Sequence, residues 1–94
     1  MTTDEKAKAL PTILHTFYRN RVTGELQPSD LILKCDIHHG GANIYYKPQR
    51  GGDYTFCLCC GETLSEAIDI MYQRVQDLHL TETEPFVDEV RTNR

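Results

Sequence analysis

Apolar residues recur at helical spacing in one long stretch after residue 60. These positions are separated by three or four residues, which places them on one side of a helix: Leu64, Ala67, Ile68, Met71, Val75 and Leu78. Thr63 and Glu66 form a T-x-x-E capping box, which is typical of a helix start. The pattern predicts the main helix of the chain over residues 63–79.

The N-terminal part shows a shorter stretch of the same kind. Four apolar positions fall at i, i+3, i+4 and i+7: Leu10, Ile13, Leu14 and Phe17. Pro11 is tolerated only in the first turn of a helix, so the pattern predicts a helix over residues 11–20. Residues 1–9 are polar, and we expect them to be frayed.

A second T-x-x-E motif, from Thr81 to Glu84, precedes Pro85 and a few apolar residues near the C-terminal end. Proline is favoured in the first turn of a helix. This pattern predicts a short helix over residues 84–91.

Between the helices the hydrophobic pattern has a period of two or is continuous over a few residues, as in strands. The runs are DLILK at residues 30–34, ANIYYK at 42–47 and DYTF at 53–56. The last two, separated by turn-forming residues, predict a β-hairpin. Alternation places Ile44 with Tyr46 on one face of the sheet, and Tyr45 with Lys47 on the other.

The length of 94 residues fits one small domain over residues 1–94, whose core would benefit from a metal. No apolar run approaches the ~18 residues of a membrane span, and the start of the chain is unlike a signal peptide. We therefore expect a cytoplasmic protein with no membrane partner. Thiols stay reduced in the cytoplasm, where clustered cysteines indicate metal more often than disulfides.

Charge is unevenly distributed along the chain. Residues 1–60 carry seven Lys/Arg and six Asp/Glu, whereas residues 61–94 carry three and eight, and the net charge of the whole chain is -4. Any nucleic-acid surface must therefore be local. The acidic C-terminal third offers an alternative, which is docking on a basic surface of a partner protein.

All four cysteines and two of the four histidines lie in residues 35–60. Cys35 and His38 are separated by two residues, as are Cys57 and Cys60, and a predicted hairpin joins the two pairs. Two tight turns that each donate a pair of ligands match a tetrahedral zinc site. The spacing predicts one structural Zn²⁺ within a zinc-binding hairpin over residues 30–61.

Other assignments of these residues stay open. His39 could replace His38, and Cys59 could replace Cys57 or Cys60. A C-x-x-C redox pair and four unrelated thiols are further options, but neither explains both pairs. A site closed by four protein ligands has no position for an activated water, so we expect neither an enzyme nor a small-molecule substrate.

Aromatic and basic residues interleave on the predicted strands and could stack and hold single-stranded bases. The candidates for this nucleic-acid-binding set are Lys34, Tyr45, Tyr46, Lys47, Arg50 and Tyr54. Packing of the aromatic rings in the core is the alternative.

The order of these motifs resembles the N-terminal zinc-binding domain of DnaG-type bacterial primases. The resemblance is carried by CDIH at residues 35–38, YTFCLCCG at 54–61 and EAIDIM at 66–71. It implies an α+β zinc ribbon, with a small antiparallel sheet flanked by helices, and a role in recognising single-stranded DNA.

Three features separate the chain from that family. HGGAN at residues 39–43 stands where the family has a charged loop, and Cys59 stands where the family has a glycine. The length of the chain also leads us to expect no polymerase domain. We expect a free-standing, non-catalytic module, of a kind that phages carry, that contacts single-stranded DNA or a replication complex. The alternative is a regulator that binds replication or transcription proteins through its acidic helical surface.

Overall fold

Five strands form one curled, mixed sheet in the order β4-β3-β2-β1-β5, and two helices accompany it. The computed structural model describes residues 1–50 and 52–93. The elements in chain order are α1 (Thr3–Ala9), β1 (Ile13–Asn20), β2 (Leu26–His38), β3 (Gly41–Pro48), β4 (Phe56–Gly61), α2 (Leu64–Asp77) and β5 (Phe86–Asn93).

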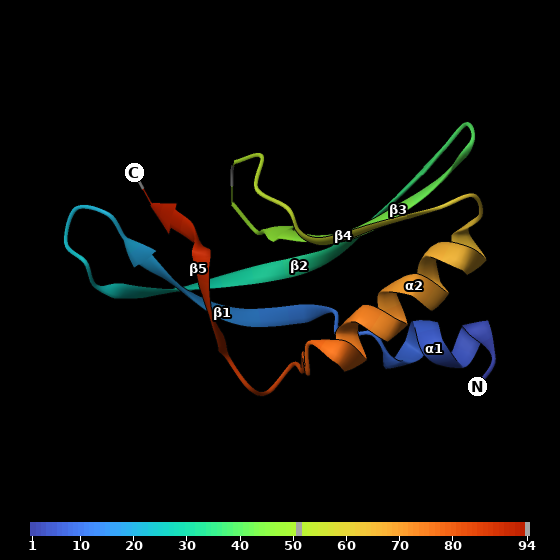
Figure 1. Ribbon diagram of the computed structural model, residues 1–94, viewed down its shortest axis with the longest axis horizontal. Helices are drawn as coiled ribbons and strands as arrows, with labels where there is room; N and C mark the ends of the chain where they lie inside the picture. Colours follow the sequence, from blue (N-terminus) through green and yellow to red (C-terminus); the bar gives the residue numbers. More distant parts are fainter. Residues whose placement is uncertain (51, 94) are drawn as a thin grey trace.

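Strands β1 to β4 run as an antiparallel meander, and each pairs with the next along the chain. Helix α2 then carries the chain back, so that β5 joins the opposite edge of the sheet parallel to β1 (Figure 1). A parallel neighbour requires such a crossover connection. The β1–β2 hairpin extends beyond the other strands on the side away from the helices (Figure 1).

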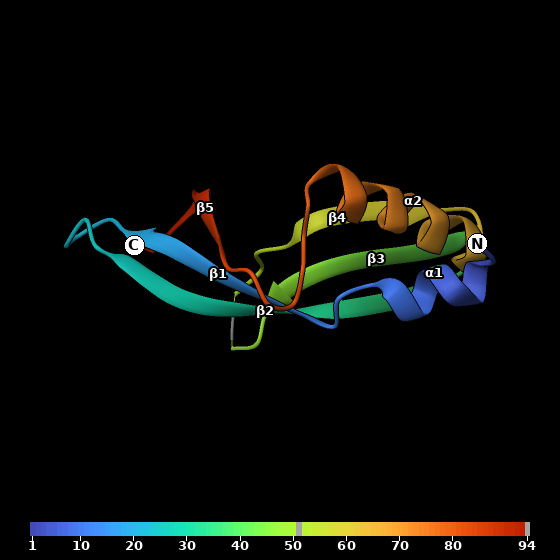
Figure 2. The same ribbon diagram turned by 90° about the horizontal axis from the view of Figure 1, so that it is seen from below.

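Both helices lie against the same face of the sheet, with α2 over β3 and β4 and α1 beside α2 (Figures 1 and 2). The core forms between this face and α2. Its buried apolar residues are Leu10, Leu14, Leu31, Ala42, Ile44, Tyr46, Cys59, Ala67, Met71, Val75 and Leu80. We call the opposite side of the sheet the open face, because neither helix covers it.

Helix α2 (Leu64–Asp77) confirms the helix predicted over residues 63–79. The Thr63 side chain accepts a hydrogen bond from the Glu66 N–H and caps α2, whose buried residues are Ala67, Met71 and Val75. Gly61 lies directly against this first turn, where a Cβ at residue 61 would be 2.6 Å from the Ala67 nitrogen.

The predicted helix over residues 11–20 is wrong, because residues Ile13–Asn20 form β1. Leu14 and Thr16 are buried, while His15 between them is exposed, which is the period of a strand. Tertiary pairing with β2 and β5 on both sides of this segment overrides its helical spacing.

The two chain ends also differ from their predictions. The final segment Phe86–Asn93 is strand β5 and not the short helix predicted over 84–91, although the Glu84 N–H does donate to the Thr81 hydroxyl. The N-terminal residues expected to fray form α1, with a complete capping box between Thr2 and Glu5.

The fold is α+β, as predicted, but the sheet is mixed and its helices lie on one face. The runs at 30–34 and 42–47 lie within β2 and β3, and β4 pairs antiparallel with β3. Of the run at 53–56 only Phe56 is in β4. A zinc ribbon stays a prediction. No helix of the described chain is long and apolar enough to cross a membrane.

Candidate nucleic-acid interface

Strand β3 separates the two faces of the sheet residue by residue. Ala42, Ile44, Tyr46 and Pro48 are buried toward the core, and the residues between them are half-buried. Directly paired residues on neighbouring antiparallel strands share a face. The open face therefore continues from Tyr45 and Lys47 onto Lys34 and Ile32, their partners on β2.

Three of the predicted nucleic-acid contacts come together on this open face. Lys34 and Tyr45 are direct cross-strand partners, and Lys47 lies two residues beyond Tyr45 on the same side of β3. Lys34 is exposed, and the side chains of Tyr45 and Lys47 are half-buried. The sheet thus presents one aromatic ring between two ammonium groups.

Tyr46 is a correction to the predicted set, because its side chain is 0% exposed. Its hydroxyl donates to the Pro11 carbonyl oxygen at 2.8 Å, and burial raises the pKa of the phenol. The alternation of β3 sends Tyr46 to the core face, so its ring cannot stack on a ligand at the open face.

The other two predicted contacts lie in the connection between β3 and β4. Arg50 is exposed, next to the undescribed residue 51. Tyr54 is half-buried, and its hydroxyl donates to the carboxylate of Asp88 on β5. Asp88 is only 6% exposed, so this bond ties the connection to the far edge of the sheet.

A pocket of about 330 Å³ lies where this connection meets the open face. Its lining residues are Asp36, Tyr45, Lys47, Gly52, Asp53, Tyr54, Thr55 and Leu58. The Tyr45 hydroxyl donates to the Asp36 carboxylate at 2.7 Å, which raises the pKa of that phenol. We call this cavity the tyrosine pocket.

The predicted zinc ligands do not form one group in this arrangement. Strand β2 continues through Cys35 to His38 and pairs with β3 throughout, so residues three apart face opposite sides of the sheet. Cys60 also lies on the face opposite Cys35, because Cys60 pairs with Asn43 whereas Cys35 pairs with buried Ile44. The tight turn predicted at Cys35–His38 is therefore wrong for this structure, because that segment is a continuous strand.

The four thiols are free and differ in exposure. Cys35 and Cys60 are exposed. Cys57 is half-buried, and its Sγ lies 3.8 Å from the Met71 Sδ. Cys59 is buried, and its thiol donates to the Ala67 carbonyl oxygen at 3.3 Å. Burial raises the pKa of both Cys57 and Cys59.

Two predicted ligands do share a cavity. His38 and Cys60 line a pocket of about 440 Å³ at the end of the sheet together with Glu62 and Glu66. His39, the alternative to His38, is exposed. Across residues 1–50 and 52–93, however, no three His, Cys, Asp or Glu side chains are grouped closely enough to hold a metal ion. The donor set as placed does not fit a tetrahedral zinc site.

The acidic C-terminal third was the alternative binding surface, and in the part of the chain that the structure describes at least four of its eight carboxylates have partners. The four and their partners are Asp69 with Lys6, Asp77 with Gln73, Glu82 with Thr12, and Asp88 with Tyr54. The Asp77 contact lies within α2, and the other three join the acidic segment to the rest of the fold, so fewer carboxylates remain for a partner protein.

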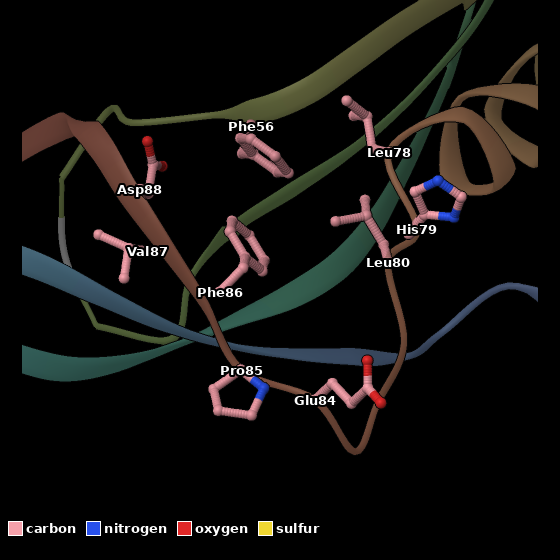
Figure 3. Close-up of a pocket in the computed structure, with 9 residues that line it drawn as sticks. All are labelled: Phe56, Leu78, His79, Leu80, Glu84, Pro85, Phe86, Val87 and Asp88. Carbon is pink, nitrogen blue, oxygen red and sulfur yellow. The ribbon is translucent and has the colours of Figure 1, made fainter.

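A third pocket, of about 370 Å³, is lined by the start of β4, the segment after α2 and the start of β5. Phe56 and Phe86 face each other there with ring centroids 5.2 Å apart, and Leu80 points toward them (Figure 3). This contact joins the start of β4 to the start of β5 and supports the curl of the sheet.

Three residues of the candidate site were not predicted from the sequence: Asp36, Asp53 and Leu58. The alternation of β2 could have shown Asp36, since it lies two residues from Lys34 on the same face. Leu58 reaches the open face because the pairing register between β3 and β4 shifts there, next to Cys57, which has a φ of 58°. The alternation of apolar and polar residues does not indicate such a shift.

Comparisons with known proteins give no match for this chain among protein-family models, curated proteins or solved structures.

Proposed function

We propose that the chain is a non-catalytic module that binds single-stranded nucleic acid on the open face of its sheet. The observation that carries the proposal is the placement of Tyr45 beside Lys34 and Lys47 on a face that no helix of the described chain covers. The resemblance to primase zinc-binding domains is consistent with this role, but the proposal does not depend on it.

The physical basis is a stacking platform flanked by cations. Any base can stack on the accessible part of the half-buried Tyr45 ring, and the lysines beside it can pair with the adjoining phosphates. Exposed apolar side chains extend the same face, with Ile13 40% and Leu58 45% exposed. We place this binding in the cytoplasm, where the four free thiols stay reduced.

The charge of the chain limits the expected strength of nucleic-acid binding. The chain has a net charge of -4, so it cannot bind phosphate backbones through its whole surface. If Lys34, Lys47 and Arg50 each neutralise one phosphate, log Kd should change with log salt concentration with a slope of about 2, since each single-strand contact contributes ~0.7. Binding should therefore be clear at low salt and weak at physiological salt.

Fluorescence anisotropy with labelled single-stranded DNA and RNA tests the proposal. We expect Lys34→Gln and Lys47→Gln each to weaken binding and to lower the salt slope by ~0.7. The matched control is Lys8→Gln, which removes the same charge from an exposed position on α1. The proposal fails if neither nucleic acid binds at about 50 mM salt, or if all three variants behave alike.

A further inference from the structure

The tyrosine pocket holds two aromatic rings whose far ends are fixed by carboxylates. Asp36 accepts from the Tyr45 hydroxyl at 2.7 Å, and the largely buried Asp88 accepts from the Tyr54 hydroxyl. A ring anchored at its hydroxyl loses little further freedom when a flat ligand stacks on it, which favours binding. The pocket is therefore prepared for a planar group before any ligand arrives.

The size of the pocket limits what can enter. Its volume of about 330 Å³ is near the lower end of the range for small-molecule sites, roughly 300–1,000 Å³. That is enough for one heteroaromatic base with part of its sugar, and too little for a helix or a pair of stacked side chains. Leu58 adds an apolar wall to the two rings.

Two carboxylates, those of Asp36 and Asp53, line the pocket. Asp53 is exposed in the connection, and within the described chain no hydrogen bond or ion pair occupies its carboxylate. The second oxygen of Asp36 is also at hand beside Tyr45. Carboxylates accept from the exocyclic amino group of cytosine, but they repel the carbonyl oxygen that uracil and thymine carry at the same position.

We propose that the tyrosine pocket receives one unstacked base of the bound strand and prefers a base with an exocyclic amino group. This inference rests on the proposed function and adds a base preference to it. Lys47 lines the same pocket, where its ammonium group can pair with the phosphate of the inserted nucleotide.

The test compares two thymidine oligonucleotides that differ at one central position, which is deoxycytidine in one and deoxyuridine in the other. These bases differ mainly in amino against carbonyl at the position that faces a carboxylate. We expect the deoxycytidine strand to bind more tightly by on the order of three- to tenfold. Asp53→Asn should reduce that ratio toward one, because an amide both donates and accepts. Glu25→Gln, at an exposed turn away from the pocket, is the matched control.

A 2-aminopurine base at the same central position reports the stacking directly. We expect its fluorescence to fall on binding to the natural chain and to stay high with Tyr45→Leu, which removes the ring. Tyr45→Phe keeps the ring and loses only the bond to Asp36, so it should retain most of the quenching. Circular dichroism of both variants shows whether the fold is kept.

The outcomes separate the two proposals. Salt-dependent binding with equal affinity for the deoxycytidine and deoxyuridine strands and no change in 2-aminopurine fluorescence would overturn the pocket and leave the open-face function standing. No binding to any oligonucleotide would overturn both. Cytidine monophosphate that binds as tightly as the deoxycytidine strand would identify the ligand as a free nucleotide, contrary to the inference.

Discussion

The carboxylate of Glu82 accepts two hydrogen bonds from Thr12, one from its backbone N–H at 2.7 Å and one from its hydroxyl at 3.0 Å. These bonds join the segment after α2 to the segment that enters β1, seventy residues earlier in the chain. Because donors stabilise the ionised carboxylate, they lower the pKa of Glu82 below its usual 4.5.

This pairing predicts a pH-dependent contribution to stability. A group whose pKa is lowered on folding stabilises the fold above its unfolded pKa, and the contribution disappears as pH falls through the folded pKa. We expect Glu82→Gln to lower the melting temperature at neutral pH and to match the natural chain in strong acid. Exposed Glu84→Gln is the control, and thermal unfolding across pH is the measurement. A constant difference at all pH values would contradict the prediction.

The buried hydroxyl of Tyr46 gives a second prediction. Tyr46→Phe leaves the Pro11 carbonyl oxygen without its donor in the core, which should cost about 1–3 kcal/mol of unfolding free energy. Nucleic-acid affinity should not change, because this ring is not on the open face. Urea unfolding and anisotropy measure the two effects, with Tyr45→Phe as the partner variant on the other face. Lost affinity in a folded Tyr46→Phe protein would contradict our assignment of the faces.

The spacing of apolar residues explains both the helix that was predicted correctly and the helix that was predicted wrongly. Residues 63–79 were predictable as a helix because their apolar stripe spans several turns and begins at a capping threonine. At residues 11–20, the spacing of four residues between Leu10 and Leu14 fits one face of a helix. Four is also a multiple of two, the period of a strand, so Leu10 and Leu14 can equally face the same side of an extended segment. Only pairing with β2 and β5, which is not local information, decides between them.

The part of the candidate site on β3 was predictable from the alternation of side chains between the two faces of a strand. Tyr45 and Lys47 were expected on the face opposite Ile44 and Tyr46, and the structure confirms this. Which of the two faces the helices cover could not be read from the strand itself. Tyr54 and Asp88 come together only because the sheet curls and brings β5 to the β3–β4 connection, a contact between segments 34 residues apart.

The exposure of the four thiols predicts their reactivity. Cys35 and Cys60 are exposed, whereas Cys59 is 1% exposed and Cys57 is half-buried, and burial raises the pKa of the latter two. Thiolate is the reacting form, so we expect two fast and two slow thiols in the native chain. Ellman's reagent with mass mapping measures this, and four fast thiols in denaturant provide the control. Fast labelling of Cys59 would show that β4 is not packed as described.

Zinc binding by Cys35, His38, Cys57 and Cys60 stays a prediction, and the structure attaches a condition to it. For Cys35 and His38 to reach one ion, β2 must turn between them and give up its pairs with Asn43 and Ala42. A bound zinc should therefore speed amide exchange at this end of β3. An unchanged exchange pattern would show that any zinc present is held elsewhere.

Native mass spectrometry at equimolar zinc measures the stoichiometry. The zinc hypothesis predicts one Zn²⁺ per chain that is lost on denaturation and absent from Cys60→Ser. Cys59→Ser is the matched control, because its thiol already donates to the Ala67 carbonyl in the core and should not be needed for the metal. A native mass equal to that of the chain alone would contradict zinc binding. Zinc retained in Cys60→Ser but lost in Cys59→Ser would move the ligand set to the alternative cysteine.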